Sequence, residues 1–354
     1  MPSLSKEHFD LYSAFHVPET HAWPSSHLHD HPIAGDGGAC IPVIDISDPD
    51  AASIVGGACS SWGVFYATSH GIPADLLNQV ESHARRLFSL PLHRKLQTAP
   101  RDGSLSGYGR PPLSSFFPQL MWSEGFTLAG HDQLAVTSQL CPFDSFSFCE
   151  VMEAYRKEMK KLAGRLMRLM LLSLGLDEEE MGQVGPIKEL SQAAAEVIQL
   201  NSYPTCPEPE RAIGMAAHTD SAFLTVLHQS DGAGGLQVLR DEDESGSARW
   251  VDVLPRPDTL VVNIGDLFRI LSNGRFKNVR HRAVVSRADH RISAACFVGP
   301  PAHIKVGSIS KLVDMRLGPI YRPVTWPEYL EIRTRLFDKA LDSVKFQEKG
   351  LEKD

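Results

Sequence analysis

Short runs of alternating hydrophobic and polar residues fill the chain between residues 196 and 299. The strand candidates are EVIQLNSYP, FLTVLHQ, LQVLR, WVDVLP, TLVVNIGD, RHRAVVS and RISAACFVG, and DGAGG, DEDESGS, PRPD, SNGR and RADH separate them as turns. Many closely spaced antiparallel strands favour a closed or double-sheet β architecture. We therefore predict a jelly-roll core over residues 195–304.

Helical periodicity predominates on both sides of this region. Apolar residues recur at helical spacing from Pro73 to about Phe88, from about Phe146 to Leu174, and around Trp326 to Val344. The predicted fold class is α+β, mainly β, with a double-stranded β-helix (jelly-roll) core braced by N-terminal and C-terminal helices. Residues 40–190 form the N-terminal mixed helical region, and residues 305–354 form the C-terminal helical segment.

Two stretches lack clear periodicity. Residues 1–39 are expected to form an irregular arm in which VPETHAW (17–23) packs on the body, and its alternating His27, His29 and His31 are expected to be solvated loop residues. Residues 101–127 are rich in Gly, Pro and Ser and are interleaved with aromatic residues. Such a loop is often a lid or pocket wall, although its rings could equally pin it to the core.

The composition narrows the class of protein. The formal net charge of −8 argues against a nucleic-acid surface or a basic membrane-binding face. The six cysteines show no CxxC pairing, which is typical of free thiols in a reducing compartment. The first residues, MPSLSKEHFDLY, do not have the pattern of a secretory signal. We expect a cytoplasmic protein without nucleic-acid or membrane partners, and the sequence does not indicate its protein partners.

His218 and Asp220 stand two residues apart in MAAHTDSAFLTVL, whose flanks are typical of a β-strand. On a strand, such residues point to the same face and could bind one metal ion together. Alone, a His-x-Asp pair is more often a surface turn. A metal site needs a third ligand, and among the later histidines we choose His281 because it precedes the turn and strand that begin at Arg291.

Polar residues on two strands could hold a carboxylate near that site. Arg291 and Ser293 share one strand face, where a guanidinium fork and a hydroxyl suit a carboxylate ligand. Gln199, Asn201 and Tyr203 alternate on another strand and could point into the same cavity. The face that turns inward depends on a strand register that the sequence leaves open.

The ordered set His218-x-Asp220, His281 and Arg291-x-Ser293 resembles the HxD…H…RxS signature of plant 2-oxoglutarate and Fe(II)-dependent dioxygenases. NSYPTC (201–206) resembles the NxYPxC strand of that family, and the likeness covers about residues 40–335. The resemblance implies that His218, Asp220 and His281 bind Fe(II). It also implies that 2-oxoglutarate is held by Arg291, Ser293, Tyr203 and Asn201, that O₂ is consumed, and that ascorbate serves as reductant.

VPETHAW, GYGRPPLSSFF, LMWSEGF and VTWPEYL are similar to segments of gibberellin 3-oxidases. This narrower resemblance implies 3β-hydroxylation of a gibberellin, a diterpenoid carboxylic acid, with desaturation or oxidation at neighbouring carbons as further outcomes. Ser69, Arg110 and Arg269 depart from the expected pattern. The substrate residues expected are the apolar walls and polar groups Tyr108, Phe116, Trp122, Phe297 and Gln199, with Arg110 or Arg269 for the carboxylate.

Two other functions remain open at this point. A gibberellin 2-oxidase, or another plant oxygenase such as a flavonoid oxidase, would share the iron chemistry but act on another carbon or substrate. A jelly-roll binding protein could hold metal and ligand without turnover. An assay for succinate formed from 2-oxoglutarate distinguishes such a binding protein from an enzyme, because only an enzyme would form succinate.

Overall fold

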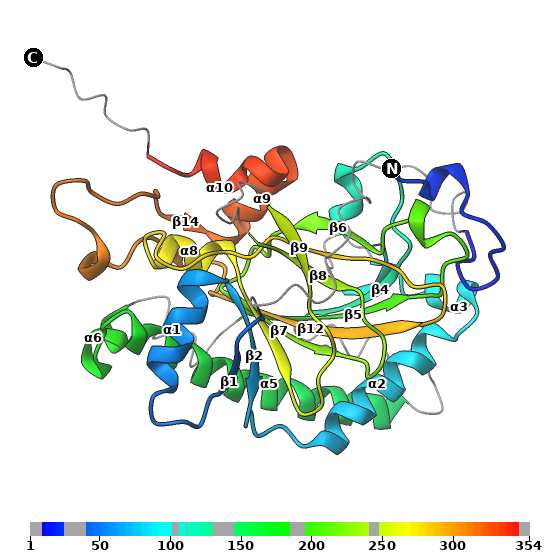
Figure 1. Cartoon of the computed structure of the whole chain (residues 1–354), viewed down its shortest axis with the longest axis horizontal. Helices are drawn as coiled ribbons and strands as arrows, with labels where there is room; N and C mark the ends of the chain where they lie inside the picture. Colours follow the sequence, from blue (N-terminus) through cyan, green and yellow to red (C-terminus); the bar gives the residue numbers. More distant parts are fainter. Residues whose placement is uncertain are drawn as a thin grey trace, which may run out of the picture.

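Two β-sheets form the centre of this computed structural model (Figure 1), which describes residues 9–24, 40–100, 106–110, 112–129, 145–184, 195–240 and 248–346. The major sheet has the order β1-β2-β10-β7-β12-β5-β4-β3, and the minor sheet has the order β6-β11-β8-β9. The strands of the major sheet are β1 (Val43–Asp45), β2 (Val64–Thr68), β3 (Gly107–Gly109), β4 (Glu124–Ala129), β5 (Ala195–Tyr203), β7 (Leu224–Gln229), β10 (Leu260–Ile264) and β12 (Arg291–Gly299). Those of the minor sheet are β6 (Met215–His218), β8 (Leu236–Arg240), β9 (Arg249–Asp252) and β11 (His281–Ala283), and β13 (Lys305–Val306) pairs with β14 (Val324–Thr325).

Helices cover the sheets from two sides (Figure 1). Helices α1 (Ala51–Ser61), α2 (Ala74–Phe88) and α5 (Ser145–Ser173) lie along one side, and α9 (Trp326–Leu336) and α10 (Ala340–Ser343) lie on the other. The shorter helices are η2 (Glu19–His21), α3 (Leu92–Leu96), η4 (Pro112–Phe116), α6 (Glu178–Gln183), η6 (Pro209–Arg211), α8 (Asp266–Leu271), η7 (Ser310–Leu312) and η8 (Phe337–Lys339).

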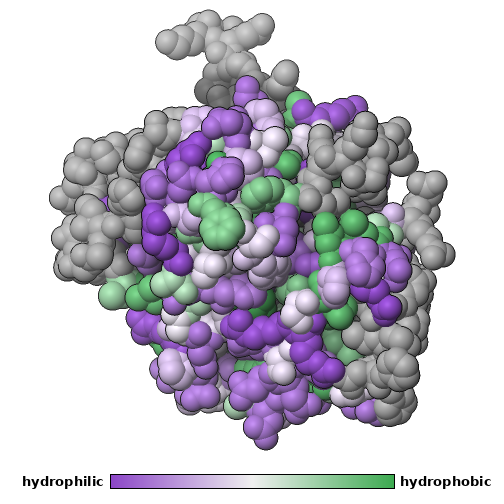
Figure 2. Space-filling model, turned by 90° about the vertical axis from the view of Figure 1, so that its right-hand side faces the viewer, coloured by the Kyte–Doolittle hydropathy of each residue, from purple (hydrophilic) through white to green (hydrophobic). Residues whose placement is uncertain are grey.

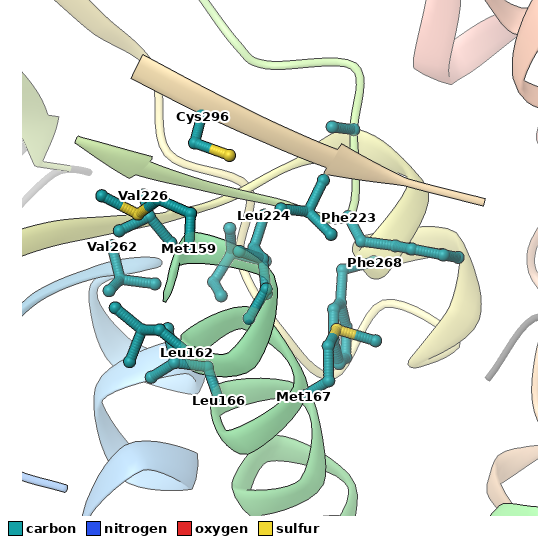
Figure 3. Packing of buried hydrophobic residues seen from close by; sticks show 14 of the residues in the cluster. Met159, Leu162, Leu166, Met167, Phe223, Leu224, Val226, Val262, Phe268 and Cys296 are labelled. Atoms are coloured by element: carbon teal, nitrogen blue, oxygen red, sulfur yellow. The ribbon is translucent and has the colours of Figure 1, made fainter. Parts of the chain in front are cut away.

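The major sheet is buried on both faces because its strands are apolar at successive positions. In β2, Phe65 and Ala67 belong to the core beneath the helices, whereas Val64 and Tyr66 belong to the core shared with the minor sheet. Figure 3 shows Leu162 and Leu166 of α5 packed below the strands on the helix side. Burial of such a side chain contributes about 1.5–3 kcal/mol, so α5 anchors the sheet firmly.

The predicted β region and its bracing helices are confirmed. Each strand candidate between residues 196 and 299 contains a strand, and the helices expected near Pro73, Phe146 and Trp326 begin at Ala74, Ser145 and Trp326. Val17 and Trp23 of the N-terminal arm are buried, as expected for a segment that packs on the body. His27, His29 and His31 lie outside the described residues.

Two local predictions were wrong. Residues 101–127 were expected to be one irregular loop, yet β3 and β4 pair there, with Tyr108 opposite Phe126. The two rings lie 5.1 Å apart and are both buried, so their contact stabilises a hairpin in a stretch whose composition indicates a loop. The strand expected to carry both His218 and Asp220 ends at His218.

Hydrophilic residues (purple) predominate among the coloured atoms of the face in Figure 2, with hydrophobic patches (green) between them. Such a mixed surface is ordinary for a globular protein. Among the described helices, none combines the length and the apolar character that crossing a bilayer requires.

Candidate metal and cosubstrate site

Three potential metal ligands meet at one end of the minor sheet. Strands β6 and β11 pair so that His281 lies opposite His218, and the ring centroids are 4.3 Å apart. One carboxylate oxygen of Asp220, Oδ1, lies 3.7 Å from Nε2 of His218 and 3.8 Å from Nε2 of His281. One donor atom from each residue lies within 4.8 Å of the others. Two imidazoles and one carboxylate suit a divalent metal such as Fe(II), with further coordination positions left open.

Hydrogen bonds orient all three side chains. Nδ1 of His218 lies 2.8 Å from the carbonyl oxygen of Ala216, and Nδ1 of His281 lies 3.3 Å from that of Val279. A carbonyl only accepts, so each Nδ1 carries the proton and each Nε2 keeps a lone pair for a metal. The Thr225 hydroxyl donates to Oδ2 of Asp220 at 2.7 Å, which leaves Oδ1 facing the imidazoles.

The protonation states suit a cation as well. Burial, with the neighbouring His281 as the next cause, lowers the pKa of His218 to about 3. Burial alone would raise the pKa of Asp220, but the two imidazoles and the Thr225 hydroxyl outweigh it and hold that pKa below its ordinary value. Near neutral pH, His218 is therefore neutral and Asp220 ionised, as metal binding requires.

Asp220 reaches the two histidines from a turn. Its carbonyl oxygen accepts a hydrogen bond of 2.8 Å from the backbone N–H of Asp266, which draws the chain out of the β6 ladder. Residue 265 must be glycine at this crossing, because a Cβ there would lie 2.1 Å from the carbonyl oxygen of Ala222. The ligands converge through this close approach of two backbones and not through strand alternation.

A buried arginine lies on the face of the major sheet that is turned toward the minor sheet. Arg291 pairs with Tyr203 across β12 and β5, and its guanidinium carbon lies 4.9 Å from the centre of the Tyr203 ring. A Cβ at Gly235, which precedes β8, would lie 3.7 Å from Cδ of Arg291, and a Cβ at Gly214, which precedes β6, would lie 2.6 Å from the Tyr203 ring. Arg291 and Tyr203 therefore lie between the two sheets.

The hydrogen bonding of this arginine is incomplete. Nη2 of Arg291 donates to Oε1 of Gln229 at 2.8 Å, but its Nε has no partner, and neither has Oδ1 of the nearby Asn201. Within the described part of the chain, no salt bridge links Arg291 to a carboxylate. Burial lowers the pKa of Arg291. A desolvated guanidinium with a free N–H is typical of a site that receives a carboxylate ligand.

The remaining polar residues of β5 extend the same face. Ser293 is buried and pairs with Asn201, and Ala295 pairs with Gln199. Oε1 of Gln199 accepts a hydrogen bond of 2.6 Å from the Thr127 hydroxyl on β4. Gly125 pairs with Asn201, and a Cβ at Gly125 would meet Nε2 of Gln199 at 2.4 Å. The absence of a side chain at Gly125 thus leaves room for the Gln199 amide.

Two family models match the chain. The 2OG-Fe(II) oxygenase superfamily matches residues 194–300, and the N-terminal model of non-haem dioxygenases in morphine synthesis matches residues 41–142. Gibberellin 3-beta-dioxygenase 2-3 of Triticum aestivum is 44% identical over 97% of this chain and 93% of its own length. Gibberellin 3-beta-dioxygenase 4 of Arabidopsis thaliana is 44% identical over 98% of both chains. The chain belongs to the 2-oxoglutarate/Fe(II)-dependent oxygenases.

Solved structures agree with this assignment. The oxygenase superposes on a crystal structure of JOX2 in complex with 2OG, Fe and JA with a TM-score of 0.80, at 28% identity and 95% coverage of each chain. A rice dioxygenase for auxin oxidation gives a TM-score of 0.69 at 29% identity, over 86% of this chain and 98% of that one. The jelly-roll fold is thereby confirmed, and so is the expectation of an enzyme that uses Fe(II) and 2-oxoglutarate.

The residues expected to contact the substrate do not lie together in this oxygenase as the residues of the metal triad do. Gln199 and Phe297 lie on the strand face that Arg291 and Ser293 share. Tyr108 lies opposite Phe126, which pairs with Leu200, so its side chain points to the other face of the major sheet. There Tyr108 donates to Glu124, and together with Arg110 it lines a cavity of about 620 Å³.

Three further expected residues have structural contacts. Phe116 stacks on Phe337 with a centroid distance of 4.6 Å. Trp122 is fully buried, and its indole N–H donates to the carbonyl oxygen of Thr205. Arg269 donates to the Tyr321 hydroxyl and to the carbonyl oxygen of Phe276. The roles of all these residues toward the substrate stay predictions.

Sequence reasoning missed the residues that hold the ligands in place. Thr225 and Gln229 are polar positions in the strand LTVLHQ, and their contacts with Asp220 and Arg291 depend on which strands become neighbours. Asp266 follows the apolar strand LVVNI after one glycine, and only the fold shows that its carboxylate is buried.

Proposed function

We propose that this oxygenase hydroxylates a gibberellin at C-3β, with Fe(II) bound by His218, Asp220 and His281. Arg291 and Ser293 bind the distal carboxylate of 2-oxoglutarate, next to Tyr203 and Asn201. The observation that carries the substrate assignment is the 44% identity to gibberellin 3-beta-dioxygenases over nearly the full chain. The converging triad and the incompletely bonded Arg291 support the residue assignments.

The residues of the chain prepare the site for this chemistry. Bound Fe(II), together with O₂ and 2-oxoglutarate, supplies the oxidising power that converts a C–H bond to C–OH, while the cosubstrate becomes succinate and CO₂. The triad offers two imidazole Nε2 atoms and one carboxylate oxygen, which would hold Fe(II) and leave other coordination positions open for cosubstrate and O₂. Arg291 fixes the far end of 2-oxoglutarate, which sets the direction from which its keto acid end approaches.

The chosen carbon is the one held nearest to the metal, so substrate selection is a matter of positioning. On β4 and β5, Gly125 leaves space and Gln199 offers an amide that Thr127 orients. We propose that this part of the sheet borders the bound diterpenoid. Phe116 and Phe297 are proposed as apolar contacts, and Arg110 or Arg269 as the partner of the gibberellin carboxylate.

A cytoplasmic location is part of the proposal. Five cysteines lie in the described residues, and all five are free thiols. Free thiols are typical of proteins in a reducing compartment.

The test is an assay for succinate with Fe(II), ascorbate, 2-oxoglutarate and a panel of gibberellins. Wild type should form succinate when a gibberellin is present, and His281→Ala should abolish turnover because it removes one of three metal ligands. Phe65→Leu, a core change on the helix side of β2, serves as a control for a general loss of fold. Full activity of His281→Ala would contradict the ligand assignment.

A further inference from the structure

Asp266 is a buried carboxylate at the start of α8, and it connects three separate segments around the metal triad. In the part of the chain that the structure describes, its side chain accepts hydrogen bonds from four others. The donors and their distances are the Thr219 hydroxyl at 3.1 Å, the Asn278 amide at 2.7 Å, the Tyr329 hydroxyl at 2.8 Å and the Arg333 guanidinium at 3.0 Å. Asp266 is 2% exposed, so these bonds are shielded from water.

Each proposed metal ligand has a neighbour in this network. Thr219 lies between His218 and Asp220, so its bond to Asp266 fixes the turn that carries both. The backbone N–H of Asp266 also donates to the carbonyl oxygen of Asp220. Asn278 directly precedes Val279, whose carbonyl oxygen receives Nδ1 of His281. One carboxylate thus restrains the backbone beside all three ligands.

The other two donors come from the C-terminal helix α9. This helix begins with a capping box in which the Thr325 side chain accepts from the backbone N–H of Glu328 and the Glu328 side chain accepts from that of Thr325. Tyr329 and Arg333 are one turn apart on α9 and reach Asp266 together. The ion pair with Arg333 is 3.0 Å long, and the Arg333 side chain is 13% exposed. A buried carboxylate needs such a counter-charge to remain ionised at low cost.

We propose that Asp266 is a positioning residue for the iron centre, through which α9 holds the three ligands in their binding geometry. This inference rests on the proposed ligand set. Asp266 does not itself bind the metal: it accepts bonds from the segments that carry the ligands. Residues that orient metal ligands typically change metal affinity about 10- to 100-fold when they are substituted.

The experiment is a titration of the metal-free full-length protein with Mn(II), followed by electron paramagnetic resonance of the free and the bound ion. Asp266→Asn should raise the Mn(II) dissociation constant about tenfold or more, because the amide cannot replace the charge that pairs with Arg333. It should also alter the spectrum of the bound ion, a change that a general loss of stability would not produce. Tyr329→Phe and Thr219→Val, which each remove one hydroxyl, should raise the constant less.

Tyr66→Phe is the matched control, because it removes a buried hydroxyl that donates to the carbonyl oxygen of Leu254, far along the chain from this network. Its Mn(II) affinity should equal that of wild type. If Asp266→Asn fails to fold, Thr219→Val and Tyr329→Phe still decide the matter. Wild-type affinity and spectra in the folded network variants would overturn the role of Asp266. Equal Mn(II) binding by wild type and His281→Ala would instead refute the ligand set itself.

Discussion

At the scale of single residues, the site depends on side chains whose hydrogen bonds are complete except where a ligand would bind. His218, Asp220 and His281 are each oriented by a partner, and their metal-binding atoms are left facing one another. Arg291 is fixed by Gln229 through one nitrogen, while its Nε remains without a partner. On the proposed assignment, Arg291 can receive a carboxylate without first breaking an ion pair to a described carboxylate of the chain.

Arg291→Lys should raise the KM for 2-oxoglutarate about 10- to 100-fold, because an ammonium cannot form the paired hydrogen bonds of a guanidinium. The Mn(II) affinity of the variant should stay at the wild-type value, since Arg291 does not orient the triad. Initial rates at varied 2-oxoglutarate concentration measure the effect. Arg256→Lys, an exposed arginine, is the control. A KM for 2-oxoglutarate equal to the wild-type value would contradict the assignment of Arg291 to the carboxylate site.

The sequence was sufficient to propose the triad and the Arg291–Ser293 pair, because their spacing is a pattern of residue types that chemistry restricts. It was not sufficient for Thr225, Gln229 or Asp266. A threonine in a strand and an aspartate after one are common, and their meaning arises only when the chain brings residues 219, 266, 278 and 329 together.

At the scale of elements, alternation predicted which strand residues share a face but not every strand's end. Asn201 and Tyr203 do share the face of Ser293 and Arg291. Strand β6, however, ends at His218. Beyond it, the carbonyl oxygen of Asp220 accepts a hydrogen bond from the backbone N–H of Asp266 and not from a neighbouring strand. Ser69 has a φ of 52°, a conformation that Asn adopts more readily, which agrees with its being a departure from the family pattern.

The N-terminal arm is held by aromatic contacts that should make stability depend on pH. His21 lies 5.8 Å from Trp122 and 5.6 Å from Phe9, measured between ring centroids. Burial, followed by the Arg110 guanidinium, lowers the pKa of His21 to about 4. The unfolded chain binds a proton at about pH 6.5, so this group's contribution is complete above that pH and is lost as the pH falls toward 4.

His21→Gln should therefore lose less stability than wild type between pH 7.5 and pH 5, values chosen to lie on either side of the unfolded pKa of about 6.5. Melting temperatures at the two pH values measure the difference. His16→Gln, on an exposed position of the same arm, is the control for loss of an imidazole. An equal drop in wild type and His21→Gln would show that the arm does not carry this pH dependence.

At the scale of the whole molecule, the site lies where the minor sheet supplies the two histidines of the proposed metal triad and the major sheet supplies the residues proposed to bind the cosubstrate carboxylate. Helices α1, α2 and α5 stabilise the far face of the major sheet (Figure 1), and α9 reaches the metal end through Asp266. The class of fold was predictable from strand spacing. The pairing of β6 with β11 was not, because register depends on contacts between distant segments. The division into four segments stays a prediction.

The most direct test of the account is the position of the new hydroxyl group. A gibberellin with an unsubstituted C-3 is incubated with the protein, Fe(II), ascorbate and 2-oxoglutarate, and the product is identified by mass spectrometry against authentic standards. The account predicts a 3β-hydroxylated product, with at least one succinate formed for each hydroxyl added. A 2-hydroxylated product, or succinate formation that no gibberellin stimulates, would contradict it.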